Sequence, residues 1–199
     1  MKNNHFVKVL LVFMFCTVFS AGINAQNTFS QGDNNINLGI GIGSTLGGHG
    51  YKSTLPTLSI SYERGIIDEL FDDKSSLGIG GYFGYATNKY EWPNATGKNK
   101  YGFNYSYIII GARGALHYQL LDKLDTYGGV FMGFNIIRHD TYGKWDDTFI
   151  TQPTAPATGN ALGWSIFVGA RYYFHENIAA FAEFGYGISI LQLGISLKF

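Results

Sequence analysis

The sequence contains a single cysteine, Cys16. It lies inside an apolar run, residues 9–22, directly after Met14 and Phe15, where a bacterial lipoprotein signal would have small residues. We therefore expect no lipid attachment at Cys16. Once this run is removed with the leader described below, no cysteine is left. This excludes a disulfide framework and thiol chemistry in the remaining chain.

Charged residues are also scarce, at 14% of the chain, and the 14 Lys and Arg residues equal the 14 Asp and Glu residues in number. No basic stripe runs along the sequence, which argues against a nucleic-acid partner held through its phosphates. The chain has only four prolines, and neither a Pro/Gly/Ser linker nor a helical period divides it. We therefore expect one domain after the leader.

Residues 1–25 have the pattern of a secretory signal peptide. Lys2 and Lys8 flank a short polar start, residues 9–22 are apolar, and small or polar residues follow. The apolar run is shorter than the roughly 20 residues that a helix needs to span a bilayer, which argues against a retained anchor. We expect cleavage after Ala25, which leaves residues 26–199 as the domain described below.

Glycine and aromatic residues are abundant, with 27 Gly, 14 Tyr and 16 Phe. This composition favours β-strands with close contacts between strands. Apolar residues also alternate with small or polar ones at a period of two, as they do in strands. The alternation covers eight segments: residues 35–43, 55–64, 76–87, 103–121, 126–136, 162–174, 179–187 and 191–199.

The connections between these segments alternate in length. Short turns on one rim and longer polar loops on the other are typical of an up-and-down barrel in an outer membrane. The link near Ile188 and Ser189 is a very short connection on the loop rim. Residues 65–75, 122–125 and 175–177 are the expected turns, and residues 44–54, 88–102 and 138–161 are the expected loops.

The alternation indicates a membrane barrel and not a soluble one. A soluble barrel would turn Leu, Ile and Val inward. The outer face would then consist of glycine, serine and few charges, which could not form a soluble surface. The lumen of eight strands is just filled by side chains, and small or paired polar groups fit it. Each segment supplies about the 9 to 11 residues that a tilted strand needs to cross lipid. The predicted fold is therefore all-β, a transmembrane eight-stranded antiparallel up-and-down β-barrel.

Outward aromatic residues gather near the ends of the segments. They predict two interfacial girdles, as in other membrane barrels. The alternative is that they are ordinary strand residues, since aromatics are enriched in any sheet. The girdle residues are Tyr62, Tyr118, Tyr172, Phe174 and Phe199 at the short-turn rim, with Tyr85 and Trp164 towards the loop rim.

The fourth segment is apolar on both faces near its middle. We place Ile108 and Ile110 outward, which turns Arg113 and His117 inward. The inward parity of the other segments adds Glu63, Arg171 and Glu183. With Arg113, two acids and two bases then share one narrow lumen. An unpaired charge there would cost several kcal/mol, so we expect the four to pair and plug the barrel. The alternative is that each charge reaches the rim and is solvated singly. The predicted luminal charge cluster is Glu63, Arg113, Arg171 and Glu183.

The chain ends with "LQLGISLKF", in which apolar residues alternate and the last residue is aromatic. A closed barrel must pair its last strand with its first to leave no edge in lipid. The stretch resembles the C-terminal signal by which outer-membrane barrels are recognised for assembly. With the leader and the eight segments, the chain resembles the small OmpA/OmpX type, without a peptidoglycan-binding domain. The assembly signal would comprise Leu193, Ile195, Leu197 and Phe199.

This resemblance implies a place in the outer membrane and contact with its lipid and lipopolysaccharide. It also implies recognition by the barrel-assembly machinery, and we expect a monomer. The sequence does not identify an extracellular ligand.

Few residues suggest chemistry. The histidines have no nucleophile or second carboxylate placed with them, so a structural or solvated role is expected. Asp146 and Asp147 in the longest loop could suggest a cation site, but adjacent acids are common on polar surfaces. We expect no catalytic residues, no cofactor and no metal. The histidines are His49 and His139 in loops, His117 in the lumen and His175 in a turn.

The favoured interpretation is an integral outer-membrane protein with a structural or surface-interaction role, exposed loops and a plugged lumen. It is not expected to be an enzyme. The alternatives are a narrow, porin-like channel and a lipid-modifying enzyme whose site the sequence does not reveal.

Overall fold

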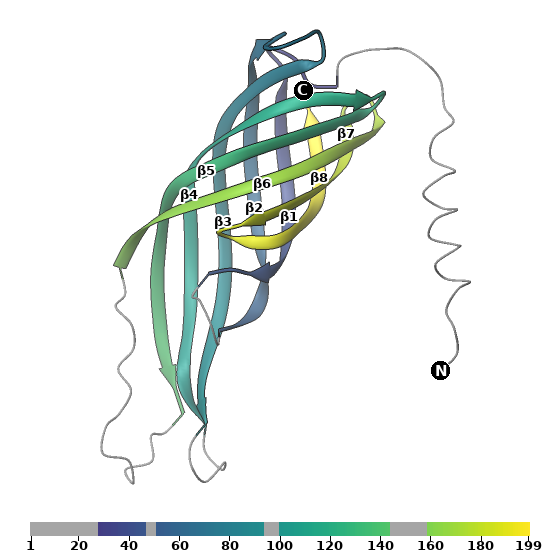
Figure 1. The fold of residues 1–199 in the computed structure, drawn as a ribbon. Helices are drawn as coiled ribbons and strands as arrows, with labels where there is room; N and C mark the ends of the chain where they lie inside the picture. The colour runs from purple at the N-terminus through teal and green to yellow at the C-terminus, as the bar shows by residue number, and fades with distance from the viewer. Residues whose placement is uncertain (1–27, 47–50, 94–99, 144–158) are drawn as a thin grey trace, which may run out of the picture.

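Figure 1 shows the computed structural model, which describes residues 28–46, 51–93, 100–143 and 159–199. The expected signal peptide with Cys16 lies outside these residues, as do His49, Asp146 and Asp147. The eight strands are β1 (Asn34–Ser44), β2 (Lys52–Asp68), β3 (Ser75–Pro93), β4 (Lys100–Leu121), β5 (Leu124–Tyr142), β6 (Gly159–His175), β7 (Ile178–Tyr186) and β8 (Ser189–Lys198).

The strands close into a barrel. Each pairs antiparallel with its neighbour in sequence, and β1 also pairs with β8. Phe199 N donates to Asn34 O at 2.9 Å, and Asn34 N donates to Phe199 O at 3.2 Å. The last residue therefore joins the first strand, and the part of the ladder that all eight strands share has no open edge, as hydrocarbon requires. The predicted closed eight-stranded antiparallel barrel is confirmed.

The outward face of the barrel is apolar. Ile40, Ile166 and Ile195 are 52%, 53% and 52% exposed, although they lie in the middle of their strands. A contiguous apolar surface of this kind faces lipid and not water, so the barrel is a transmembrane one. Its members include Leu38, Ile42, Leu58, Ile60, Ile79, Phe83, Ile110, Val130, Met132, Phe134, Leu162, Val168, Leu193 and Leu197, each on the predicted outward parity. Among the described residues, no helix has the length and apolar character to cross a membrane.

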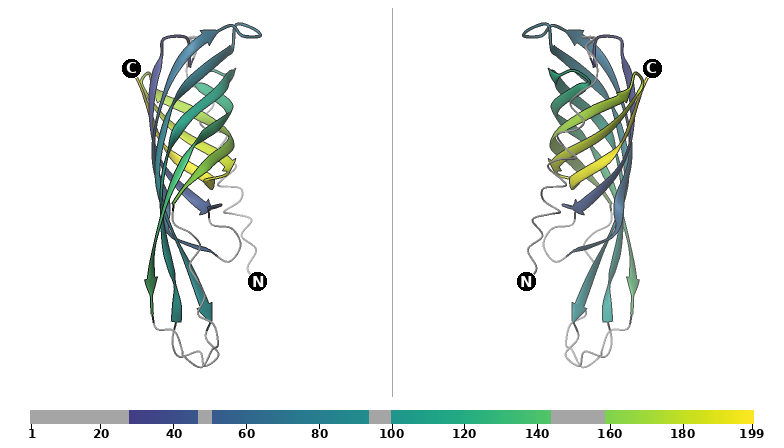
Figure 2. Two further views of the ribbon diagram at one scale, coloured as in Figure 1. Left: turned by 90° about the vertical axis from the view of Figure 1, so that its left-hand side faces the viewer. Right: turned by 90° about the vertical axis from the view of Figure 1, so that its right-hand side faces the viewer.

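Three strands continue past the lipid-facing surface. β3, β4 and β5 have 19, 22 and 19 residues, well above the roughly 9 to 11 that cross lipid. Figure 2 shows them protruding beyond the other five. Outward residues Tyr85, Ile108 and Ile136 form the last apolar row across these strands, and Thr87, Ser106 and Arg138 form the next row. We call residues 87–93, 100–106 and 138–142 the β3–β5 extension.

The extension corrects the expected loop boundaries. Residues 88–93, 100–102 and 138–142 were expected in loops but belong to strands. His139 therefore lies on β5, packed against the rings of Phe103 and Tyr105. The reason is that the backbone hydrogen bonds of the ladder continue after the outward side chains have become polar.

The lumen contains two zones. Towards the loop end, aromatic side chains pack into one cluster, and towards the short turns the inward residues are charged. Inward glycines leave space for the rings of Phe167 and Tyr127. A Cβ on Gly129 would lie 2.7 Å from Phe167 Cζ, and one on Gly169 would lie 2.8 Å from Tyr127 Cζ. The aromatic cluster comprises Leu46, Tyr82, Ala86, Tyr101, Phe103, Tyr105, Tyr107, Ile109, Phe131 and Ile188.

Candidate functional site

Inward side chains from five strands meet in the half of the lumen nearer the short turns. The period of two places them on the luminal face, and closure of the barrel brings them together. We call this group the luminal ion network. It comprises Glu63 of β2, Arg113 and His117 of β4, Asp125 of β5, Arg171 of β6 and Glu183 of β7, all buried.

Arg113 and Glu183 form the part of the network nearer the loops. Arg113 Nη2 lies 2.8 Å from Glu183 Oε1. The same carboxylate oxygen accepts a hydrogen bond from the Tyr127 hydroxyl at 3.0 Å. Arg113 also donates to Ser61 Oγ at 3.4 Å, and its guanidinium lies 4.2 Å from the centre of the Phe167 ring. This pair is held by ionic, hydrogen-bonding and cation–π contacts together.

Arg171 joins two acids nearer the short turns. Its Nη2 is paired with Glu63 Oε2, and its Nη1 lies 3.0 Å from Asp125 Oδ2. The guanidinium also stacks 4.5 Å from the centre of the Tyr127 ring. Arg171 and Glu63 are both 0% exposed, so their charges are compensated by protein groups and not by water.

His117 links the same two acids from the other side. Its Nδ1 lies 2.9 Å from Asp125 Oδ1, and its Nε2 lies 3.1 Å from Glu63 Oε1. When both acids are ionised, each can only accept, so both ring nitrogens donate and the ring is the protonated imidazolium. The three carboxylates of the network are then balanced by two guanidiniums and one imidazolium.

The predicted cluster is therefore present as two groups, Arg113 with Glu183 and Arg171 with Glu63. The alternative of four charges solvated singly at the rim is wrong, because all four are buried and paired. Asp125 was expected in a turn, and that placement is wrong: β5 begins at Leu124, and Asp125 faces the lumen. Its parity with the inward Tyr127 and Phe131 is the signal that could have found it.

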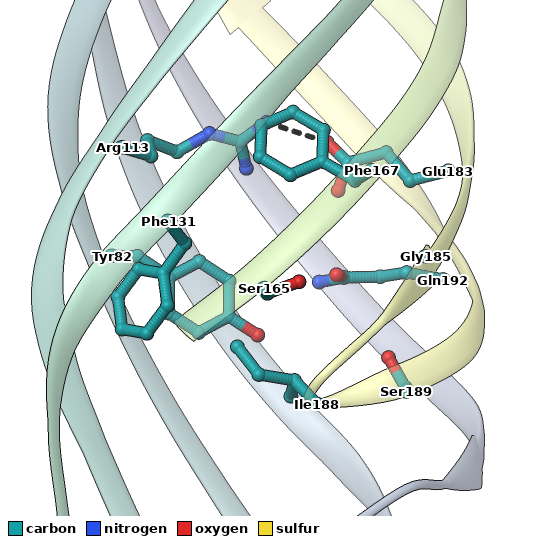
Figure 3. A pocket seen from close by; sticks show the side chains of 10 residues that line it. All are labelled: Tyr82, Arg113, Phe131, Ser165, Phe167, Glu183, Gly185, Ile188, Ser189 and Gln192. Atoms are coloured by element: carbon teal, nitrogen blue, oxygen red, sulfur yellow. Dashed lines mark hydrogen bonds and ion pairs between the residues drawn. The ribbon is translucent and has the colours of Figure 1, made fainter. Parts of the chain in front are cut away.

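A small cavity lies between the Arg113–Glu183 pair and the aromatic cluster. In Figure 3, Tyr82 and Phe131 lie on one side of it, and Gln192 and Ser189 lie on the other. Its volume of about 20 Å³ suits one or two water molecules. Among the described residues, no hydrogen-bond partner is found for Arg113 Nε or the Tyr82 hydroxyl, which are buried there, and this fits a small hydrated gap.

The remaining candidates lie apart from the network. His175 ends β6 at a turn and is exposed. Leu193, Ile195 and Leu197 face outward on β8, and Phe199 is exposed at the rim. The role of these four in assembly stays a prediction. Within the described ranges, no group of three or more His, Cys, Asp or Glu side chains is arranged to hold a metal ion.

No family model matches the sequence, and no curated protein matches it. Solved barrels resemble it in structure. OprG of Pseudomonas aeruginosa, an outer-membrane protein, has a TM-score of 0.49 and 11% identity, covering 86% of this chain and 97% of OprG. Ail of Yersinia pestis, the attachment invasion locus protein, has a TM-score of 0.43 and 11% identity, covering 85% and 99%.

The N-terminal β-barrel domain of Pseudomonas aeruginosa OprF has a TM-score of 0.41 and 16% identity, covering 85% of this chain and 98% of that domain. All three TM-scores lie below 0.5, so these likenesses assign no function to this chain.

Proposed function

We propose that this chain is an integral outer-membrane protein with a closed lumen and a structural or surface-interaction role. The luminal ion network is the observation that carries the proposal. The network is buried, its positive and negative charges are equal in number, and its members form ion pairs across the barrel. A conducting pore needs a continuous hydrated path, whereas here paired charges and an aromatic cluster fill two successive levels of the lumen.

The outward surface supports the membrane part of the proposal. Its apolar side chains fit the hydrocarbon, and the polar β3–β5 extension continues past them at the loop end. Outer-membrane lipid and lipopolysaccharide would surround the barrel, and the assembly machinery would insert it as a monomer after signal cleavage. Membrane fractionation and N-terminal sequencing of the extracted protein test these points. The expected results are the outer-membrane fraction and an N-terminus at Gln26.

Conductance distinguishes the closed barrel from a narrow channel. Purified folded protein in a planar bilayer should give no steady current, because no network member is free to leave its partner without exposing a buried charge. The double variant Arg113→Ala/Glu183→Ala removes one level of the plug and serves as the comparison. Steady, large conductance by the unaltered protein would refute the closed lumen.

The geometry also favours a protein without enzymatic activity over a lipid-modifying enzyme. His117 is occupied by two carboxylates, and His139 is packed among rings. Among the described residues, neither is hydrogen-bonded to a serine or threonine that it could activate. Mass spectrometry of lipid A from cells with and without the protein should give identical spectra. A mass change that depends on the protein would establish the enzyme instead.

The surface-interaction role would belong to the β3–β5 extension. Its outward side chains are polar or charged and include Lys89, Asn104, Arg138 and Asp140. We expect Lys89→Glu/Arg138→Glu to change adhesion of whole cells while folded protein in the membrane stays constant. Lys74→Glu/Lys123→Glu makes the same charge change in two short turns and should leave adhesion unaltered. Equal adhesion in all three strains would remove the extension from the proposal.

A further inference from the structure

Residues 28–33, which precede β1, fold across the short-turn mouth of the barrel. We call them the mouth segment. Thr28 and Phe29 are buried, although they lie outside the sheet. The Phe29 ring stacks on His117 with the ring centres 4.1 Å apart and an interplanar angle of 28°. The same ring lies 5.7 Å from the Arg171 guanidinium, so Phe29 covers the luminal ion network from the periplasmic side.

The barrel wall is shaped to receive this ring. Gly78 faces it from β3, and a Cβ there would lie 3.1 Å from Phe29 Cε1 and 3.0 Å from Glu63 Oε1. Gly65 faces the next residues from β2, and a Cβ there would overlap the carbonyl oxygen of Ser30. Two glycines on adjacent strands therefore leave space for the mouth segment.

The segment is anchored to strands on both sides of the closure. Thr28 N donates to Gln119 Oε1 at 3.1 Å, and Ser76 Oγ donates to the Phe29 carbonyl at 3.1 Å. Lys198 Nζ, from β8, approaches the Thr28 carbonyl at 3.5 Å. Further along, Gly32 N donates to Gly65 O at 3.0 Å. The anchoring residues belong to β2, β3, β4 and β8, so all of them come together only when the barrel has closed.

We infer that the mouth segment is a seal, which the mature N-terminus forms over the periplasmic end of the lumen. The segment isolates His117, Glu63 and Arg171 from the periplasm. It is held by one ring and a few hydrogen bonds, most of them to single side chains of the barrel, whereas each strand is held by two ladders of backbone hydrogen bonds. Local opening therefore releases the segment before any strand. Its release admits water and small solutes to the network while the barrel stays closed.

Thiol labelling tests the seal directly. Cys16→Ser makes the chain free of cysteine, and Ser76→Cys then places one thiol under the Phe29 carbonyl. Lys74→Cys, on the exposed turn nearby, gives the rate of an open site. Folded protein in detergent micelles is treated with a charged, water-soluble maleimide, and the heat-dependent gel shift verifies folding in every sample.

Two substitutions should release the segment by different routes. Phe29→Ala removes the ring, and Gly65→Ala pushes out Ser30 without altering Phe29. Each should raise the labelling rate of Ser76→Cys by roughly 100-fold or more, because labelling follows local opening and a buried phenylalanine dominates what holds the segment. Gly81→Ala is the matched control, since the nearest atom to its Cβ would be 3.9 Å away, and it should leave the rate unchanged.

The outcomes are decisive whether or not the barrel conducts, so the seal can fail without the proposed function failing. Labelling of Ser76→Cys at the Lys74→Cys rate in the otherwise unaltered protein overturns the seal. Continued protection in folded Phe29→Ala protein also overturns it. If Phe29→Ala does not fold, the rate in Gly65→Ala takes its place. If neither folds, the segment is part of the folding core and not a seal, and the inference is wrong.

Discussion

The Arg113–Glu183 pair can be removed one partner at a time, which measures how much the pair contributes to the stability of the barrel. The two side chains are 3% and 6% exposed, and the nitrogen and oxygen lie 2.8 Å apart. Within the described part of the chain, Arg113→Ala leaves the Glu183 carboxylate with only the Tyr127 hydroxyl as a hydrogen-bond donor. It also removes the guanidinium from the face of Phe167. The remaining carboxylate is then a buried charge without an opposite charge.

Removing one partner of a buried pair costs about 3 to 5 kcal/mol in the free energy of unfolding. We expect this for Arg113→Ala and a similar value for Glu183→Ala. The double variant leaves no unpaired charge, so its cost should fall short of the sum by about 0.5 to 3 kcal/mol. The Lys89–Glu91 pair is a matched control, because its atoms are as close, at 2.7 Å, but its side chains are 31% and 30% exposed. Breaking it should cost no more than about 1 kcal/mol.

Urea unfolding from lipid vesicles, followed by tryptophan fluorescence, gives the four free energies of each cycle. Both cycles are measured in the same lipid and at the same pH. Additive costs for Arg113→Ala and Glu183→Ala would show that the two groups do not interact. Costs no larger than those of the Lys89 and Glu91 variants would show that water reaches the network.

Three other changes test the lipid face, the closing strand and the luminal packing. Ile166→Arg should cost about 2 to 4 kcal/mol, whereas Asn104→Arg, above the apolar surface, should cost under about 0.5 kcal/mol; equal costs in urea unfolding would contradict the assigned faces. Deleting Phe199 should reduce assembled barrel, as read from the heat-dependent gel shift, and an unchanged folded yield would count against an assembly signal. Gly169→Ala places a Cβ 2.8 Å from Tyr127 Cζ and Glu183 Cγ and should cost about 1 to 3 kcal/mol. Gly114→Ala, with its nearest atom at 3.8 Å, is the control, and similar costs for both would refute the packing argument.

Side-chain alternation in the sequence by itself determines most of the fold. Successive side chains of a strand point to opposite faces, so Ile166 and Ser165 could be assigned to lipid and lumen from their positions alone. The same rule turned Arg113 and His117 inward, although the middle of that segment is apolar on both faces. Strand closure through Phe199 followed from the requirement that no edge remain in hydrocarbon.

The lengths of the strands were not determined in this way. The polar residues after Ile136 predict that β5 ends there, but the strand continues through Arg138, His139 and Asp140. Polar outward residues end the lipid contact without ending the backbone ladder. The sequence pattern shows where the lipid contact ends, and only the pairing of the strands shows where the ladder ends. Asp125 is a similar case, because it is a polar residue beside a turn but belongs to the ladder of β5.

Only the closed barrel decided which charges meet. Arg171 pairs with Glu63, 108 positions away, and Arg113 pairs with Glu183, 70 positions away. Alternation gives the face of a residue but not its height or its neighbours across the lumen, because these depend on the stagger of all eight strands. The mouth segment is the extreme case. Phe29 lies outside the alternating pattern, and it has a site only because β2, β3, β4 and β8 build one around it.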